Sequence, residues 1–182
     1  MSTEMGGVYG NVHIVLTDKY GNIKQEMTKK NTITVSFLWQ MMGSRMYANV
    51  TTTYLCLTFA SNTAIPTKNF AGDTSTNSAL YPLWNSAFYS YQQSPTPSFN
   101  PNPAEGNPYI SATFYVAPGT GSGTIKTLYT STYSYGAQYS SPSNIASYVV
   151  FNSNEWIIKG AADALTVTWL WYFAGNYKNN WF

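Results

Sequence analysis

The chain contains a single histidine, His13, which is the first residue to consider for acid–base chemistry. It sits in an alternating stretch of apolar and polar residues, and no acid or nucleophile stands beside it in the sequence. The members of a Ser-His-Asp triad come from distant positions, so sequence order alone does not decide whether His13 has such partners. Half of the positions in such a strand face solvent, and we therefore interpret His13 as a structural or surface histidine.

Seven carboxylates are the other candidates for acid–base chemistry. A glycosidase needs two carboxyl groups about 5 to 9.5 Å apart across a sugar, and no spacing in this sequence favours such a pair. Short aspartate side chains in turns commonly bond their own backbone, and we expect this role for Asp18, Asp73 and Asp163. We therefore predict no catalytic residue and no enzymatic activity.

Metal and cofactor sites have little support in the sequence. One cysteine, Cys56, and one histidine cannot supply the four ligands of a zinc site. Calcium held by loop carbonyls and a single aspartate has no motif behind it. The glycine-rich stretch GTGSG at 119–123 lacks the helix and lysine of a phosphate-binding loop, so we interpret it as a hairpin turn. We expect no metal and no cofactor.

Aromatic side chains are the remaining group that could carry function, with 16 Tyr, 6 Trp and 9 Phe. An aromatic face can stack on the apolar face of a sugar ring while Asn or Gln side chains bond its hydroxyls. Tyrosine is also a good strand former and a frequent residue of protein interfaces. No loop gathers Trp with Asn and Asp into one cluster, so we favour a protein interface over a sugar site.

The charge pattern narrows the class of partner. Charged residues make up 9% of the chain and the net charge is +2, against a usual charged share of about a quarter. The scattered basic residues leave no footprint for a phosphate backbone, so we expect no nucleic-acid partner. We also expect no membrane span and no cleaved leader, which would place synthesis in the cytoplasm. Few charges protect such a surface weakly against self-association.

The elements that must position these residues are mostly strands. The stretch VYGNVHIVLTDKYGNIKQEM predicts a hairpin with a short glycine-containing turn, and residues 34–47 are predicted to form the one helix. About eight to ten short strands with turns between them indicate a single domain over residues 1–182, an antiparallel β-sandwich of jelly-roll-like form. The later strands are expected in YLCLTFAS, LYPLWNSAFYSYQQ, YISATFYVAP, TIKTLYTSTYSYG, SYVVFN, EWIIK and ALTVTWLWYF.

The last strand has one apolar face and one mixed face. Leu165, Val167, Trp169, Trp171 and Phe173 should face the core, while Thr166, Thr168, Leu170 and Tyr172 share the other side. Because the mixed face is only half polar, we expect another surface to cover its far end. The tail over 175–182 follows this strand, and we predict that it docks on a partner. The predicted interface residues are Tyr172, Tyr177, Trp181 and Phe182.

The stretch SPTPSFNPNPAEGNP at residues 94–108 holds five prolines in fifteen residues. Proline removes a backbone donor and fixes φ, which argues against regular structure and favours an extended, polyproline-like arm. The arm is either a surface excursion or a strap on a neighbouring subunit.

Three stretches resemble parts of tailed-bacteriophage virion proteins. The opening GNVHIVLTDKYGNIKQEMTKKNTIT resembles the start of such proteins, where a hairpin of the form G-x-V-x-I-x-L-x-D-x-x-G-N leads to a basic residue, Asn and an apolar-Thr pair. The segment GSRMYA is similar to their short helix with an Arg-Met pair. The ending WIIKGAADALTVTWLWYF is similar to their closing segment. The proline-rich arm departs from the group.

The resemblance implies a non-enzymatic structural protein of the virion: a head-decoration, cement, collar or tail component, made in the host cytoplasm. Its partners would be copies of itself and other virion proteins. The alternative is a carbohydrate-binding adhesion module on a virion, with a host glycan as its ligand. A subunit of a repeating assembly can keep low charge and exposed aromatics because neighbours cover them.

Overall fold

The computed structural model describes residues 7–33, 54–61, 63, 87–92, 98–100, 109–133 and 145–174. Every element in these ranges is a strand, and every strand pair is antiparallel. The helix predicted over 34–47 lies outside the described residues. The strands are β1 (Gly7–Thr17), β2 (Ile23–Ile33), β3 (Tyr54–Ala60), β4 (Ala87–Gln92), β5 (Ser98–Asn100), β6 (Tyr109–Val116), β7 (Gly123–Ile125), β8 (Thr127–Tyr133), β9 (Ile145–Val150), β10 (Ile157–Lys159) and β11 (Ala164–Ala174).

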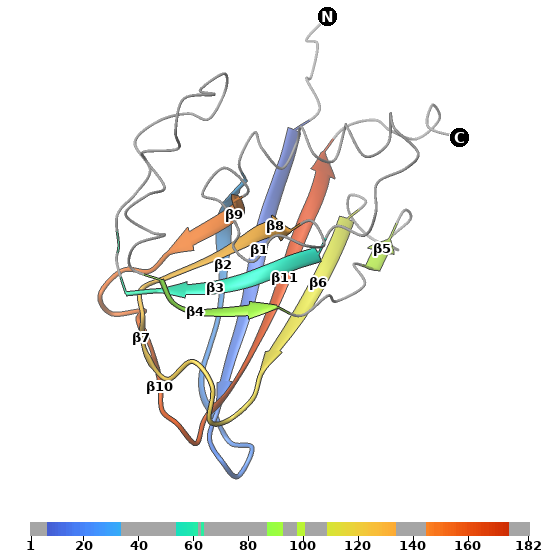
Figure 1. The fold of residues 1–182 in the computed structure, drawn as a ribbon. Helices are drawn as coiled ribbons and strands as arrows, with labels where there is room; N and C mark the ends of the chain where they lie inside the picture. Colours follow the sequence, from blue (N-terminus) through green and yellow to red (C-terminus); the bar gives the residue numbers. More distant parts are fainter. Residues whose placement is uncertain are drawn as a thin grey trace, which may run out of the picture.

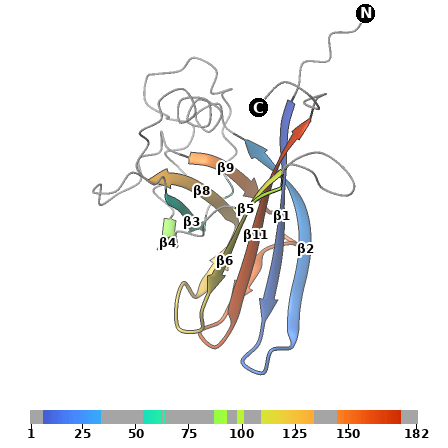
Figure 2. The same cartoon turned by 90° about the vertical axis from the view of Figure 1, so that its right-hand side faces the viewer.

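Nine of the eleven strands form one sheet in the order β4-β3-β8-β9-β2-β1-β11-β6-β5. We call β2, β1, β11, β6 and β5 the long half and β4, β3, β8 and β9 the short half. The halves join where the end of β2 pairs with β9, at Thr32–Tyr148 and Ile33–Ser147. The strands of the short half cross one face of the long strands (Figure 1, Figure 2). The prediction of an all-β antiparallel fold is confirmed.

Strands β1 and β2 form the predicted hairpin, and Asp18 and Gly21 shape its turn. The Asp18 carboxylate accepts hydrogen bonds from the backbone N–H groups of Tyr20 at 2.8 Å and Asn22 at 2.9 Å. Gly21 has a φ of 87°, a left-handed conformation that glycine adopts at little cost. Hydrogen bonding by the Asn22 side chain is the main cause that lowers the pKa of Asp18. The predicted turn role of Asp18 is confirmed.

Strand β11 lies between β1 and β6 and shows the predicted alternation. Trp169 and Trp171 are fully buried, whereas Thr168 and Leu170 on the other face are partly exposed. The register explains this pattern, because each inward residue of β11 lies between inward residues of both neighbouring strands. The face assignments of the last strand are therefore confirmed over residues 165–172.

The core lies between the two halves of the sheet. Its largest side chains include Trp169 and Phe114 from the long half and Phe59 and Leu57 from the short half. Fully burying a large apolar side chain stabilises the fold by roughly 1.5–3 kcal/mol. In the short half, Leu57–Ala60 and Thr127–Thr130 are buried without alternation, so both faces of these strands are covered.

Strands β7 and β10 form a separate two-stranded sheet. The prediction that GTGSG is a hairpin turn is wrong, because it connects β6 of the large sheet to β7 of the small one. Gly119 and Gly121 have φ values of 84° and 59°, which let the chain change direction between the two sheets. Lys126 alone separates β7 from β8, so the run expected as one strand from Thr124 is divided between the sheets.

The two edge strands of the large sheet come from proline-containing runs. Strand β4, from the run LYPLWNSAFYSYQQ, stands at one end of the strand order. Strand β5 stands at the other end and falls inside the arm predicted to lack regular structure. Its three residues contain no proline, since Pro97 and Pro101 flank the strand. The rest of the arm over 94–108 lies outside the described residues.

Candidate functional site

Of the four predicted interface residues, only Tyr172 lies in the described part of the chain; Tyr177, Trp181 and Phe182 lie outside it. Tyr172 stands on the outer face of β11, two residues before Ala174, which pairs with Gly7. It therefore sits at the end of the sheet to which the tail is joined. This position makes the surface around Tyr172 the place to examine for a partner site.

Tyr172 is the middle residue of a row of three tyrosines, which we call the tyrosine ladder. Its partners in the register are Tyr9 on β1 and Tyr109 on β6. The Tyr9 and Tyr172 rings stack with centroids 5.0 Å apart and 10° between their planes. The Tyr109 ring lies 5.6 Å from that of Tyr172 and is tilted by 54°. The Tyr9 residue is 44% exposed, so the ladder borders solvent.

The geometry of the ladder favours one kind of recognition. Because Tyr9 and Tyr172 stack face to face, one face of each ring is covered by the other ring. A sugar-stacking platform needs open ring faces, whereas a protein interface can also use ring edges and hydroxyls. The ladder therefore fits a protein surface better than a sugar ring.

The outer face beside the ladder is rich in small polar residues on β1, β11 and β6. The next row across β1, β11 and β6 is Asn11, Leu170 and Ser111. One row further, the hydroxyl oxygens of Thr168 and Thr113 lie 3.1 Å apart in a hydrogen bond. An aromatic centre with a polar rim is the usual composition of a protein interface.

His13 lies on the same outer face, in the row of Thr168 and Thr113. Its Nε2 atom is 2.9 Å from Oε1 of Glu26, and the two side chains are 39% and 51% exposed. The histidine predicted to be structural or at the surface thus has a carboxylate partner on β2.

Each carboxylate in the described ranges has a hydrogen-bonding partner. Besides Asp18 and Glu26, Glu155 accepts hydrogen bonds from Lys29 and from the Asn152 backbone. Asp163 accepts one from Lys24 at 2.6 Å and one from the Gly160 N–H at 2.8 Å. The turn role predicted for Asp163 is confirmed by the Gly160 bond, while Asp73 lies outside the described residues. No three His, Cys, Asp or Glu side chains of the described part gather as metal ligands.

These two ion pairs join the first hairpin to the segment before β11. In both, a hydrogen bond from the lysine is the main cause that lowers the carboxyl pKa, helped by a backbone N–H. Lys24 follows the turn of the β1–β2 hairpin, whereas Lys29 lies opposite Val12 in the middle of β1. The two ion pairs therefore tie the hairpin to this segment at two places along β2.

Lys159 is the most buried cation of the described residues, with 1% of its surface exposed. Its ammonium donates hydrogen bonds to the backbone oxygens of Ala117 at 3.3 Å and Thr120 at 2.8 Å. Burial lowers the pKa of Lys159, and the nearby charge of Asp163 raises it in part. Lys159 thus fastens the turn after β6 to the end of β10.

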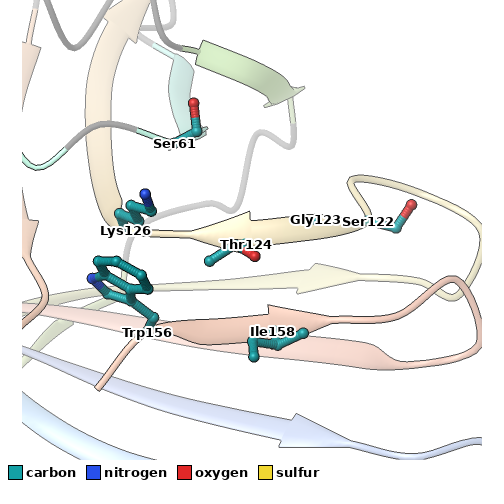
Figure 3. Close-up of a pocket in the computed structure, with 7 residues that line it drawn as sticks. All are labelled: Ser61, Ser122, Gly123, Thr124, Lys126, Trp156 and Ile158. Carbon is teal, nitrogen blue, oxygen red and sulfur yellow. The ribbon is translucent and has the colours of Figure 1, made fainter. Parts of the chain in front are cut away.

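A pocket of about 610 Å³ lies on the outer side of the small sheet (Figure 3). Lys126 and Trp156 both line this pocket, and the Nζ atom of Lys126 lies 4.2 Å from the centroid of the Trp156 indole ring. Sequence reasoning missed this pocket because its residues come from three distant segments. It is lined by Ser61, Ser122, Gly123, Thr124, Lys126, Trp156 and Ile158.

Sequence reasoning also missed the partners of Tyr172. The alternation of β1 already places Tyr9 on the outer face, and the same alternation in β6 places Tyr109 there. An antiparallel pairing of the first predicted strand with the last would have placed Tyr9 opposite Tyr172. Tyr109 had no such signal, because four strands, β7 to β10, separate β6 from β11 in the chain.

The described part of the chain has no helix with the length and apolar character that crossing a bilayer requires. Comparisons with protein-family models, with curated proteins and with solved structures found no match. The features of the described residues that bear on function are the tyrosine ladder, the surrounding polar face and the pocket beside the small sheet.

Proposed function

We propose that the chain is a structural subunit of a tailed-bacteriophage virion, serving as a head-decoration, cement, collar or tail component. Its role is assembly through aromatic and apolar subunit interfaces, and it performs no chemical step. Its partners are copies of itself and other virion proteins, and its location is the virion. The observation that carries this proposal is the tyrosine ladder, an aromatic surface with a polar rim at the end of the sheet.

The stretches that carry the resemblance support the proposal by their position in the fold. The opening stretch forms β1 and β2, and the closing stretch forms β10 and β11. β1 pairs along its whole length with β11, and Lys24 and Lys29 bond carboxylates of the segment leading into it. The opening and closing motifs therefore belong to one folding unit, while GSRMYA lies outside the described residues. We further propose a jelly-roll-like sandwich for the whole chain, supported by two crossing halves around one core.

The interface mechanism follows from the exposed area and its chemistry. Aromatic anchors at the centre of an interface typically contribute about 2 kcal/mol or more each when a partner buries them fully. The ladder supplies rigid rings with hydroxyls, and Thr168 and Thr113 supply hydrogen-bonding groups nearby. The predicted tail residues, attached just after β11, would extend this surface.

The proposal is tested on particles. Antibodies raised against the recombinant chain should label virions of the encoding phage at one repeating position, seen by immunogold electron microscopy. A chain that is abundant in infected cells but missing from purified, intact virions would overturn the proposal.

The alternative of a carbohydrate-binding adhesion module is less well supported at the ladder, where stacked rings hide one face each. The specific observation in its favour is the Trp156 pocket. This pocket lies on a different surface, beside the small sheet.

A further inference from the structure

We propose that the pocket beside the small sheet binds an acidic sugar, namely a hexuronic acid unit of a polysaccharide. This inference goes beyond the proposed assembly role and does not depend on it. It rests on the side chains that the β7–β10 pair presents outward and on the charge of Lys126.

The pairing of β7 with β10 gathers the lining residues on one face. Thr124 pairs with Ile158, and Ile157 and Lys159 point to the buried side. Lys126 and Trp156 stand together at one end of this face, with Ser61 across from them and Ser122 at the other end (Figure 3). The result is an open pocket whose floor is partly apolar and whose rim carries hydroxyls.

Lys126 supplies a positive charge that no carboxylate neutralises in the described structure. Lys24 and Lys29 have carboxylate partners, whereas no ion pair formed by the described residues includes Lys126. Its ammonium instead lies over the Trp156 ring, and the described lining contains no acidic residue. An anionic ligand would therefore find a cation without first displacing a carboxylate.

Two hydrogen bonds hold the Lys126 backbone in place. The Lys126 N–H donates a 2.9 Å hydrogen bond to the Ala60 oxygen, and the Lys126 oxygen accepts one of 2.9 Å from the Phe151 N–H. These bonds anchor the residue between the two sheets. A fixed position lowers the cost of ordering the site when a ligand binds.

The remaining lining matches the rest of a sugar ring. The Ile158 residue is 67% exposed and, with the part of the Trp156 side chain that lines the pocket beside the ammonium, offers apolar surface to the C–H groups of a pyranose. The hydroxyls of Ser61, Ser122 and Thr124 are within the lining and can exchange hydrogen bonds with ring hydroxyls. The volume of about 610 Å³ falls in the usual range for small-ligand sites, about 300–1,000 Å³.

An acidic peptide would carry carboxylates like those of a sugar acid, but it would lack the many hydroxyl groups of a sugar ring. Three lining hydroxyl groups beside one cation suit a ligand that carries many hydroxyls and one charge. A peptide rich in Asp or Glu would bring several charges to a single ammonium. The lining therefore favours the acidic sugar.

The test measures calorimetric binding of the full chain to tetramers of galacturonic acid and of mannuronic acid. Binding of either tetramer is expected, with the methyl ester of that tetramer binding about tenfold more weakly because it loses a charge-assisted hydrogen bond. Lys126→Met should cause a similar loss, and Trp156→Leu should weaken binding of both acid and ester. A tetramer of glutamic acid should bind more weakly than the sugar acid.

Lys19→Met is the matched control, because Lys19 also holds its ammonium over an aromatic ring, 4.7 Å from the centroid of Tyr20, but on the hairpin turn. It should leave binding unchanged, and near-ultraviolet circular dichroism should show that every variant keeps the native fold. The proposal is overturned if neither sugar acid binds, if acid and ester bind equally, or if Lys19→Met weakens binding as much as Lys126→Met. Equal or tighter binding of tetraglutamate would replace the sugar by an acidic peptide.

Discussion

Gly10 lies directly opposite Asn31 in the β1–β2 pair, and the Asn31 side chain occupies the space that a Cβ on Gly10 would need. Such a Cβ would come within 2.0 Å of Asn31 Oδ1. Both amide atoms of Asn31 are buried without a hydrogen-bond partner. The glycine that begins the opening motif and the asparagine near its end are thus a packing pair, which explains why a strand interior carries a glycine.

We expect Gly10→Ala to lower the free energy of unfolding by about 1–3 kcal/mol, since the new methyl overpacks the site. Asn31→Ala should cost little, because it removes a buried amide that has no partner. In the double variant, most of the Gly10→Ala cost should disappear. Urea unfolding of the four chains measures this coupling. Gly21→Ala is the control, because it strains a turn with open space around it. Its change in unfolding free energy should simply add to that of Asn31→Ala. If the changes of Gly10→Ala and Asn31→Ala also simply added, the packing explanation would be contradicted.

The ion pairs Lys24–Asp163 and Lys29–Glu155 predict loss of stability in acid. Both carboxyl pKa values are lowered below their ordinary values of 3.8 and 4.5, mainly by the lysine hydrogen bonds. The folded state therefore binds fewer protons than the unfolded state in this range. The stabilisation is fully present above the ordinary values and is lost as pH falls through the lowered ones. The free energy of unfolding should fall from about pH 5 downward.

Asp163→Asn isolates one of these pairs. It should lower stability at neutral pH by about 1–2 kcal/mol, because a charge-assisted hydrogen bond is lost while the Lys24 ammonium stays solvated. It should also make the fall of stability in acid shallower. Lys24→Met should reduce the acid-dependent fall in the free energy of unfolding by less, because the Gly160 N–H still donates a hydrogen bond to Asp163. Urea unfolding at a series of pH values gives the slopes, and unchanged slopes in both variants would contradict the role given to this pair.

The sequence predicts which face of a strand is buried better than which strands are neighbours. The alternation in ALTVTWLWYF correctly assigns Trp169 and Trp171 to the core, because the period of a strand is set by local geometry. The same alternation does not say that β11 pairs with β1 at one side and β6 at the other. That choice depends on the whole set of contacts between distant segments.

Changes of sheet within a run of β-forming residues were also hidden in the sequence. TIKTLYTSTY has the composition of one strand, yet Lys126 divides it because its backbone bonds Ala60 and Phe151. Lys159 was equally unpredictable, since lysine is seldom buried without a partner. Its partners are backbone oxygens, which every residue has, so no residue type in the sequence marks the site.

Lys159→Met tests the buried lysine. Ala117 O would keep the 2.7 Å bond from the Thr120 hydroxyl, whereas Thr120 O would lose the Lys159 donor. An acceptor left without its donor costs about 1–3 kcal/mol, so we expect a loss of stability in that range. Lys126→Met, at the more exposed cation, should change stability by about 0.5 kcal/mol or less. A Lys159→Met chain as stable as the parent would mean that relief from burying the charge offsets the lost bonds.

The tyrosine ladder makes a prediction that separates folding from assembly. Across β1 and β11, a stacked aromatic pair contributes about 0.5–1.5 kcal/mol beyond its buried area. A double-mutant cycle with Tyr9→Thr and Tyr172→Thr should give a coupling of this size in urea unfolding, and the domain should stay folded. Self-association, measured as molecular mass against concentration by light scattering, should weaken by more than the loss of fold stability explains.

The matched control for the ladder is Thr113→Val with Thr168→Val, which removes a hydroxyl pair on the same outer face, one row beyond Leu170. It should reduce association less than the ladder variants, because rim contacts contribute less than buried aromatic anchors. If the ladder variants associate like the parent while the threonine variants do not, the contact surface lies further along β11 and β6. If both sets associate like the parent, the outer face of the long half is no interface, and the assembly proposal would have to move to another surface.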